Sequence, residues 1–427
     1  MFVKGIKSKQ WFDVPAIYRN FVGIMKELSF DKWLKQNPSA DLAALMLRAG
    51  NDEEKKRMAL QHYCRRKASS KLPALTAIDE FVFPTALSAE QCTSELLASY
   101  HGTLVEAGAT AADLTAGLGV DSFSLARRCR SLTSVELDPT VCRALSHNAE
   151  LLGYRNMTVV NSNCMEWIET AGQFDTIFID PYRRGNDGGR VFALSDCTPD
   201  VVGNLDLLLS HCSELIIKAS PMLEATRIAG ELGRHARKII FLGTRNECKE
   251  TIVICDMGTH GNPAVEAVTL ADNGLSWCFA PHHDEANART IYATPKVGDI
   301  LMEPFPAVMK TGAYEAFASA FDVAPLARDT HLFVCKADVA NLALTPAHCF
   351  SIERVMPFDK RTCRALSKEF SHLNVAVRNF PIKAPELEKR LNMKPGGNRK
   401  LYGATLSDGS ATLLLVRQPL TSRTCEP

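Results

Sequence analysis

The 427-residue sequence lacks the features that mark membrane-spanning, secreted and metal-binding proteins. It has no apolar run of about 18 residues, and its beginning lacks the apolar core of a signal peptide. Its 14 cysteines include no Cys-x-x-Cys pair and no Cys/His group with zinc spacing. We therefore expect free thiols, a cytoplasmic protein, no contact with a membrane and no bound metal.

Net charge is also low, at +1, but it is unevenly distributed. Residues 350–420 hold 13 Lys and Arg against 6 Asp and Glu, whereas residues 101–260 hold 15 against 20. A basic segment beside an acidic one suits a polyanionic substrate, because phosphate contacts supply most of the sequence-independent affinity. A solvent-exposed surface that is merely basic gives the same counts. Charge alone therefore favours nucleic acid only slightly.

The length and the apolar periodicity predict a multidomain α/β protein. Helical spacing predicts a helical N-terminal domain over residues 1–100, and residues 101–260 alternate strand and helix. That alternation predicts a mostly parallel, Rossmann-like sheet of seven strands. Two small α+β modules are expected after it, over residues 261–347 and 348–427. The seven expected strands are Ala111–Leu114, Leu132–Leu137, Met157–Val160, Thr176–Ile179, Leu215–Lys218, Lys238–Leu242 and Thr251–Cys255.

Three strand ends in the alternating region carry residues suited to a cofactor. The first is followed by Asp113-Leu-Thr-Ala-Gly117-Leu-Gly119-Val-Asp121, the second ends at Glu136, and a later one ends at Asp180. Glycine lets the backbone approach a ligand closely, because it has no side chain. An acid at the end of the second strand is placed to accept hydrogen bonds from ribose hydroxyls. This ordered series predicts a pocket for S-adenosylmethionine.

The cofactor is expected to contact several strand ends. After the third strand, the amide oxygen of Asn163 can accept a hydrogen bond from the adenine amine. The expected cofactor residues are Asp113, Thr115, Gly117, Gly119, Asp121, Glu136, Leu137, Asn163, Cys164 and Asp180.

A nicotinamide dinucleotide site is the main alternative for this pocket. Its fingerprint needs a third small residue, three places after the second glycine, and bare helix N-terminal amides for a pyrophosphate. Ser122 stands at the third position, and Asp121 would place negative charge beside a diphosphate. S-adenosylmethionine has no phosphate and carries a sulfonium, so nearby acids are favourable.

The segment that follows the fourth strand predicts the chemistry. Asp180-Pro181-Tyr182 resembles the acid-Pro-Pro-aromatic loop of amino methyltransferases, in which a side-chain oxygen and a Pro carbonyl accept hydrogen bonds from the target amine. The resemblance implies catalytic roles for these three residues, with Tyr182 either stacked on a base or packed in the loop. Arg183, Arg184 and Lys218 are expected to bind substrate, although Lys218 could instead anchor the loop.

The same segment is also similar to that of RNA methyltransferases that modify a pyrimidine carbon. Those enzymes need a Cys nucleophile after the following strand, because the ring carbon is not nucleophilic until a thiolate adds to the base. The corresponding stretch, Ile217-Lys-Ala-Ser-Pro-Met222, contains no Cys, and Cys197 and Cys212 lie elsewhere. A nitrogen target is therefore favoured.

Most of the chain resembles a family of bacterial class I methyltransferases that end in a THUMP-like domain. The resemblance implies a small ferredoxin-like module and a terminal module similar to THUMP, a fold used for tRNA binding. It supports methylation of structured RNA, tRNA in preference to rRNA, at a base nitrogen. An RNA-binding protein with a vestigial cofactor site, and a methyltransferase of proteins or small molecules, remain alternatives. The matching stretches are Ala89–Glu95, Asp113–Asp121, Asp180–Arg184, Lys218–Met222, Asn246–Glu250, Glu303–Lys310 and Arg378–Pro381.

Overall fold

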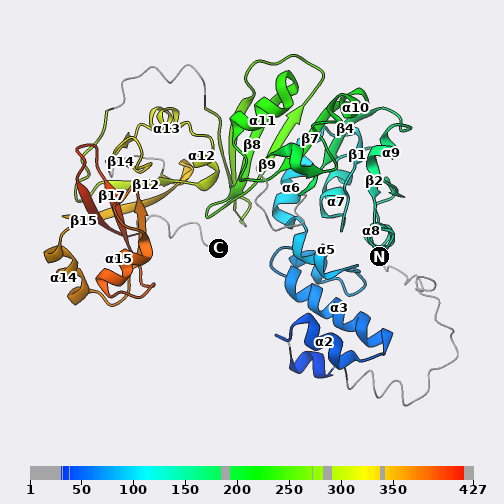
Figure 1. Ribbon diagram of the computed structural model, residues 1–427, viewed down its shortest axis with the longest axis horizontal. Coiled ribbons are helices and arrows are strands. Elements are labelled where there is room, and N and C mark those ends of the chain that lie inside the picture. Colours follow the sequence, from blue (N-terminus) through cyan, green and yellow to red (C-terminus); the bar gives the residue numbers. More distant parts are fainter. Residues whose placement is uncertain are drawn as a thin grey trace, which may run out of the picture.

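The computed structural model describes residues 30, 32–37, 39–183, 193–271, 273–281, 291–336 and 342–417. Arg184, expected to bind substrate, lies outside the described residues, as does the side chain of Arg183. Two β-sheets form two lobes, and the N-terminal helices extend from the larger lobe (Figure 1).

Short helices form the N-terminal region, as the sequence predicted. Polar residues before most of them accept hydrogen bonds from first-turn N–H groups: Asp52 before α3 accepts from Lys55, and Ser94 before α6 accepts from Leu97. The buried faces of this region pack against helices of the first lobe. The helices are α2 (Leu42–Ala49), α3 (Glu53–Ala68), α4 (Pro73–Thr76), α5 (Ala86–Gln91) and α6 (Glu95–Leu104).

The first lobe is built on a nine-stranded sheet with the order β11-β10-β8-β9-β7-β4-β1-β2-β3. All seven predicted strands are present in it, and β9 is antiparallel to both of its neighbours. The strands are β1 (Thr110–Asp113), β2 (Ser131–Glu136), β3 (Met157–Asn161), β4 (Phe174–Ile179), β7 (Cys212–Ala219), β8 (Ala236–Thr244), β9 (Cys248–Cys255), β10 (Ala264–Leu270) and β11 (Ser276–Phe279). A separate two-stranded ribbon pairs β5 (Tyr182–Arg183) with β6 (Cys197–Thr198).

Both faces of this sheet are covered, which explains why its central strands are continuous apolar runs. Ile177 and Ile179 enter one core, whereas Phe178 between them enters the core on the opposite face. The helices of this lobe are α7 (Val120–Ala126), α8 (Pro139–Leu151), α9 (Cys164–Ile168), α10 (Leu205–Ser210) and α11 (Ala225–Leu232).

Two strands extend the sheet beyond the seven that the sequence predicted. β10 lies parallel to β8, and β11 pairs antiparallel with β10, so residues 264–279 continue the first sheet past the expected boundary at 260. Without β10 the outer edge of β8 would present unpaired backbone groups. We predicted a separate module here because Pro and Gly interrupt the pattern around these strands.

The second lobe contains one seven-stranded sheet with the order β13-β14-β12-β15-β18-β17-β16. The long strand β15 pairs with β12 at its beginning and with β18 at its end, so it joins the two expected C-terminal modules into one sheet. The strands are β12 (Ile300–Pro304), β13 (Ala324–Pro325), β14 (Phe333–Cys335), β15 (Ala347–Pro357), β16 (Asn374–Arg378), β17 (Arg399–Thr405) and β18 (Ala411–Arg417), and the helices are α12 (Pro306–Lys310), α13 (Tyr314–Ala320), α14 (Lys360–Glu369) and α15 (Ala384–Leu391).

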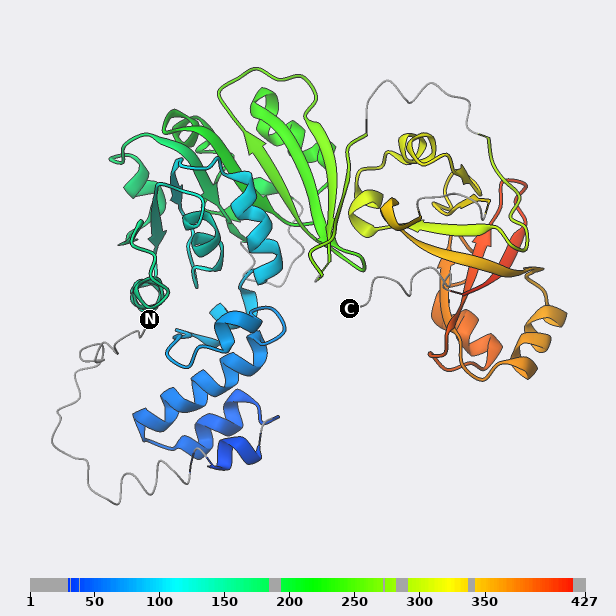
Figure 2. The ribbon, with the colours of Figure 1, turned by 180° about the vertical axis from the view of Figure 1, so that it is seen from behind.

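The two lobes meet where α12 packs beside β8 and β10, as seen from behind in Figure 2. Trp277 of β11 donates a hydrogen bond to the carbonyl of Ala343 at 2.9 Å, and its ring packs edge-on against Phe305. The Arg245 guanidinium lies over the Trp277 ring, 4.6 Å from its centre. One continuous core therefore runs from the first sheet into the second lobe.

A chain that ends at residue 346 tests whether the two C-terminal modules are separable. The truncation removes β15 and the partners of buried Glu303, whose carboxylate accepts hydrogen bonds from Tyr402 at 2.6 Å and Lys400 at 3.2 Å. A buried charge left unpaired costs about 3–5 kcal/mol. We expect hydrogen exchange in β12 to lose most of its protection. Unchanged protection of β12 would instead show that the modules fold independently.

Candidate active site

Four of the predicted site residues meet at one edge of the first sheet. The strands β7, β4, β1 and β2 are parallel neighbours, so their carboxyl ends lie side by side. Asp113, Glu136, Asp180 and Lys218 stand at or directly after these ends. Ligands of open α/β sheets bind at this edge.

The glycine loop after β1 lies against Glu136. The Glu136 carboxylate accepts hydrogen bonds from the N–H of Gly117 at 2.9 Å and from that of Asp138 at 2.8 Å. Each carboxylate oxygen still has a lone pair available for a hydroxyl donor. Beside it, the side chain of Leu137 is 69% exposed. A Cβ at Gly117 would have open space around it, which leaves the backbone accessible to a ligand.

Gly119 is required for a different reason from the one the sequence suggested. We expected a point of close approach to the ligand. Its φ is +93°, and a Cβ there would overlap the side chain of Leu145 and lie 2.9 Å from the Phe123 ring. Gly119 therefore lets α7 pack closely against α8, and this packing fixes the loop.

Asp113 lies beneath the loop, with 1% of its surface exposed. Its two oxygens accept hydrogen bonds from the N–H of Thr115 at 3.1 Å and the hydroxyl of Ser122 at 2.5 Å. Burial raises the pKa of Asp113 to about 7. Because Asp113 is buried and both of its oxygens accept hydrogen bonds from the loop and α7, it holds the loop in shape. The hydroxyl of Thr115 in turn accepts a hydrogen bond from the N–H of Asp180 at 2.7 Å.

The residues after β3 begin a short helix. Asn163 is the N-cap of α9, and its amide oxygen accepts from the N–H of Met165 at 3.0 Å. That oxygen can still accept a second hydrogen bond. Cys164 is buried behind it, and burial raises the pKa of its thiol to about 11.

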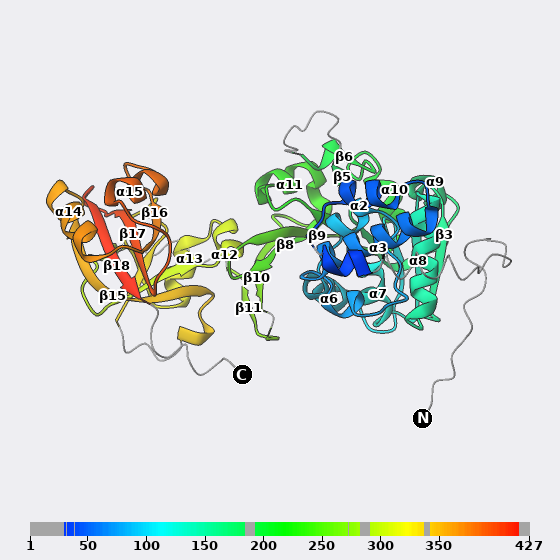
Figure 3. The same cartoon turned by 90° about the horizontal axis from the view of Figure 1, so that it is seen from below.

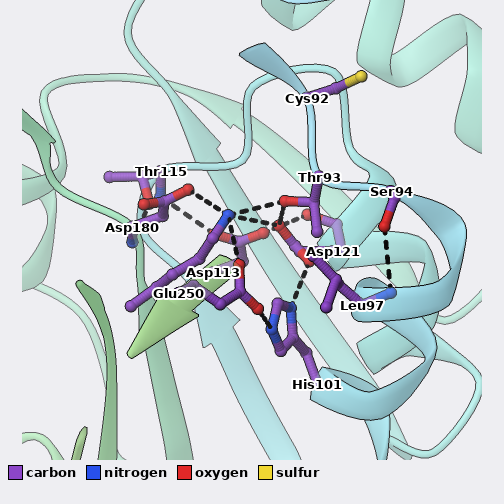
Figure 4. A network of polar contacts seen from close by, with 12 residues as sticks. Cys92, Thr93, Ser94, Leu97, His101, Asp113, Thr115, Asp121, Asp180 and Glu250 are labelled. Atoms are coloured by element: carbon purple, nitrogen blue, oxygen red, sulfur yellow. Dashed lines mark hydrogen bonds and ion pairs between the residues drawn. The ribbon is translucent and has the colours of Figure 1, made fainter. Parts of the chain in front are cut away.

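A network of charged side chains lies next to this loop (Figure 4). The Lys218 ammonium donates hydrogen bonds to Asp180 Oδ2 and Thr93 Oγ1, both at 2.7 Å. It also lies 3.7 Å from Asp121 Oδ2 and 3.8 Å from Glu250 Oε2. Only 12% of the Lys218 side chain is exposed. Of the two roles predicted for Lys218, this geometry favours anchoring over a contact with substrate phosphate.

His101 completes the network from helix α6. Its Nδ1 lies 2.7 Å from Asp121 Oδ1, and its Nε2 forms a hydrogen bond with Glu250. Burial alone would lower the pKa of His101, but Glu250 and Asp121 outweigh it and raise that pKa to about 9. Burial likewise disfavours the charged form of Asp121, yet Lys218 and His101 hold its pKa below the usual range. His101 is therefore an imidazolium at neutral pH.

Asp180 stands between the network and solvent. Its side chain is 41% exposed. Desolvation raises its pKa, and the Lys218 ammonium partly offsets this increase. Pro181 is buried, whereas Tyr182 is 62% exposed, so its ring is accessible for stacking.

Comparisons with known proteins agree with this geometry. Residues 81–193 match a family described as conserved hypothetical protein 95, residues 301–342 a ferredoxin-like domain, and residues 347–418 a THUMP domain-like family. The crystal structure of a “putative methyltransferase” from Porphyromonas gingivalis is 27% identical, with a TM-score of 0.78, and the match covers 92% of this chain and 98% of that one. Together these matches support an S-adenosylmethionine-dependent methyltransferase.

The match to a curated relative of this methyltransferase is much shorter. The rRNA adenine N-6-methyltransferase of Limosilactobacillus reuteri is 34% identical over 55 residues, which are 13% of this chain and 22% of the relative. The chain therefore spans less than a quarter of that relative's length.

Sequence reasoning missed three members of the methyltransferase's charged network: Thr93, His101 and Glu250. Thr93 and Glu250 lie in stretches that carry the family resemblance, but no local pattern gave them a role. His101 lies in a helix, where a lone His has no distinguishing signal. In the part of the chain that the structure describes, no His, Cys, Asp and Glu side chains group as metal ligands, and no helix is long and apolar enough to cross a membrane.

Replacement of Glu136 by Ala tests the predicted ribose contact. Loss of a hydrogen bond to a charged group should weaken S-adenosylmethionine binding by about 1–3 kcal/mol, which calorimetry can measure. The exposed Glu150→Ala variant on α8 is the matched control and should bind normally. Unchanged affinity in Glu136→Ala, or tighter binding of a nicotinamide dinucleotide, would contradict the assignment.

Proposed function

We propose that this methyltransferase modifies a base nitrogen of structured RNA in the cytoplasm, tRNA in preference to rRNA. The observation that carries the proposal is a basic groove of about 730 Å³ in the THUMP-like region. Lys360, Arg364 and Lys368 line it at intervals of four residues, so they share one face of α14. Among the described residues, no carboxylate lies within 4 Å of these three cations, which leaves them available for phosphates.

Other residues give this groove its shape without neutralising it. Asp359 caps α14 and accepts a hydrogen bond from the N–H of Thr362 at 2.7 Å. Arg390 of α15 pairs with Glu386 at 2.9 Å and lies over the Phe358 ring. The groove thus keeps three cations that have no carboxylate partner among the described residues, which suits a nucleic-acid backbone.

The separation between the groove and the candidate active site favours a large substrate. Helices α14 and α15 lie far from β4 and α7 along the long axis of the molecule, both in Figure 1 and from below in Figure 3. A single ligand that contacts both sites must be extended. Structured RNA satisfies this requirement, whereas a small molecule does not.

Two further observations support a nitrogen target in RNA. The relative from Limosilactobacillus reuteri is an rRNA adenine N-6-methyltransferase, although the match is short. The thiol of Cys212 is buried and its pKa is raised to about 12 by burial, which makes it a poor nucleophile for a carbon target.

Every cysteine among the described residues is a free thiol, in keeping with a reducing cytoplasm.

The chemistry assigned to this chain is positioning and proton acceptance. S-adenosylmethionine, held by the loop at Gly117 and by Glu136, would supply an electrophilic methyl group for the target nitrogen, and its sulfur would keep the electron pair of the S–C bond. The target nitrogen becomes positively charged and must lose a proton. We assign this role to Asp180, and the assignment is supported by its partly exposed side chain and by a pKa that burial raises. From there the proton can pass to solvent.

Substitution of the three groove cations tests the RNA contact. The variant Lys360→Ala/Arg364→Ala/Lys368→Ala should weaken RNA binding and reduce the slope of log affinity against log salt by about 2–3, since three phosphate contacts are lost. Electrophoretic mobility shifts at several salt concentrations measure both effects. As a control, Lys55→Ala/Lys56→Ala/Arg57→Ala removes three cations that already pair with acids of α3 and its cap. An equal loss in both variants would refute a specific role for the groove.

Substitution of Asp180 tests the catalytic assignment. Asp180→Ala should lower kcat by about 10²–10⁴-fold with S-adenosylmethionine affinity nearly unchanged, because the proton acceptor is lost. Asp180→Asn should be milder, since the amide keeps an acceptor oxygen. Cys197→Ser and Cys212→Ser should retain activity. If either serine variant abolished methyl transfer while remaining folded, a pyrimidine carbon would be the better target.

A further inference from the structure

Lys218, Asp121, His101 and Glu250 form a closed ring of alternating charge. Asp121 lies between Lys218 at 3.7 Å and His101 at 2.7 Å, and Glu250 lies between the same two cations. The four side chains come from β7, α7, α6 and β9, so the ring ties together four separate elements. Its two positive and two negative charges cancel.

The ring is closed to solvent. His101 is fully buried, the Glu250 side chain is 6% exposed, and Lys218 and Asp121 are 12% exposed each. Thr93 bridges Lys218 and Asp121: its hydroxyl accepts a hydrogen bond from Lys218 and donates one to Asp121 at 2.6 Å. Burial opposes the charge on Lys218, but the neighbouring carboxylates, Asp180 first, raise its pKa. Lys218 is therefore a permanent cation that is held in one place.

Asp180 lies outside this ring and is joined to it by a hydrogen bond from Lys218. Lys218 engages only Oδ2 of Asp180, and the Asp180 N–H is bonded to Thr115. With one oxygen and the backbone held, the carboxyl plane cannot rotate freely. Among the described residues no hydrogen bond is made to the second oxygen, Oδ1, which leaves it for an external donor on this partly exposed side chain.

We propose that Lys218 is the positioning residue for Asp180, and that the ring of His101, Asp121 and Glu250 holds Lys218 in that role. The ring fixes the position of the Lys218 ammonium, and the ammonium donates a hydrogen bond to Oδ2 of Asp180. Oδ1 is thereby oriented to accept a hydrogen bond from the N–H of the incoming amine. This inference rests on the proposed function. It assigns Lys218 no contact with substrate.

A double-mutant cycle tests the proposal. Lys218→Met, Asp180→Asn and the double variant are compared for kcat and KM, with radiolabelled S-adenosylmethionine as donor and total RNA from cells lacking the gene as acceptor. Lys218→Met should lower kcat about 100-fold while the Kd for S-adenosylmethionine stays within about twofold. In the Asp180→Asn background the same change should lower kcat less than about threefold. Equal losses in both backgrounds would overturn the proposal, because Lys218 would then act independently of Asp180.

Two further comparisons separate positioning from folding. Lys238→Met removes a 2.6 Å ion pair with Glu266 near the opposite edge of the same sheet and should leave kcat unchanged. Thr93→Val keeps every charge of the ring but removes one hydrogen bond that holds the Lys218 ammonium, and should lower kcat about tenfold, whereas Thr93→Ser should restore most of it. If Lys218→Met does not fold, the Thr93 pair decides: equal kcat in the Val and Ser variants would overturn the claim that the ammonium must be held in one place.

A measurement without RNA distinguishes this inference from the proposed function. The groups that face the Asp180 carboxyl are Lys218, Asp121, Glu250 and Asp113. NMR titration of ¹³C-labelled aspartate should show that the pKa of Asp180 rises in Lys218→Met and does not move in Lys238→Met. That result with no RNA methylation by the natural protein would overturn the proposed function alone. An unmoved pKa would overturn the positioning role even if RNA is methylated.

Discussion

The buried ammonium of Lys218 constrains much of the first lobe. A charge with so little exposure needs paired, hydrogen-bonded partners, and removal of one partner from a buried pair typically costs about 3–5 kcal/mol. The partners come from the N-terminal helices, the helix after the glycine loop and the antiparallel strand β9. The charged network thus links elements that also share an apolar core. The helical N-terminal region belongs to the active site for this reason, since it supplies Thr93 and His101.

The second constraint is the continuity between the lobes. The core that covers one face of the first sheet continues past α12 into the second lobe, and β15 extends the second sheet into the THUMP-like region. The basic groove on α14 is therefore connected through packed elements to the first sheet, whose strand ends form the candidate active site. This arrangement holds two sites at a separation that only an extended ligand can span.

Local patterns predicted the strands and the cofactor loop well. Continuous apolar runs such as Ile177–Ile179 identify strands that are buried on both faces, and all seven predicted strands occur in the sheet. The strands β10 and β11 were missed because nearby Pro and Gly residues suggested a break, although pairing along β8 favoured continuation. At Gly119 the residue was identified but its cause was not: close packing against Leu145, which no local motif reveals, requires the glycine.

The sequence by itself determined the order of strand ends, and with it the loop at Gly117, the acid at Glu136 and the acid at Asp180. These follow from short-range periodicity and spacing, which each segment carries on its own. Only the tertiary structure decided that Lys218 faces inward and that His101 is charged. His101 and Glu250 are 149 residues apart, and Lys218 and Thr93 are 125 apart. These side chains become partners only because the fold brings β7, β9 and the N-terminal region together at one edge of the sheet, where burial makes pairing obligatory.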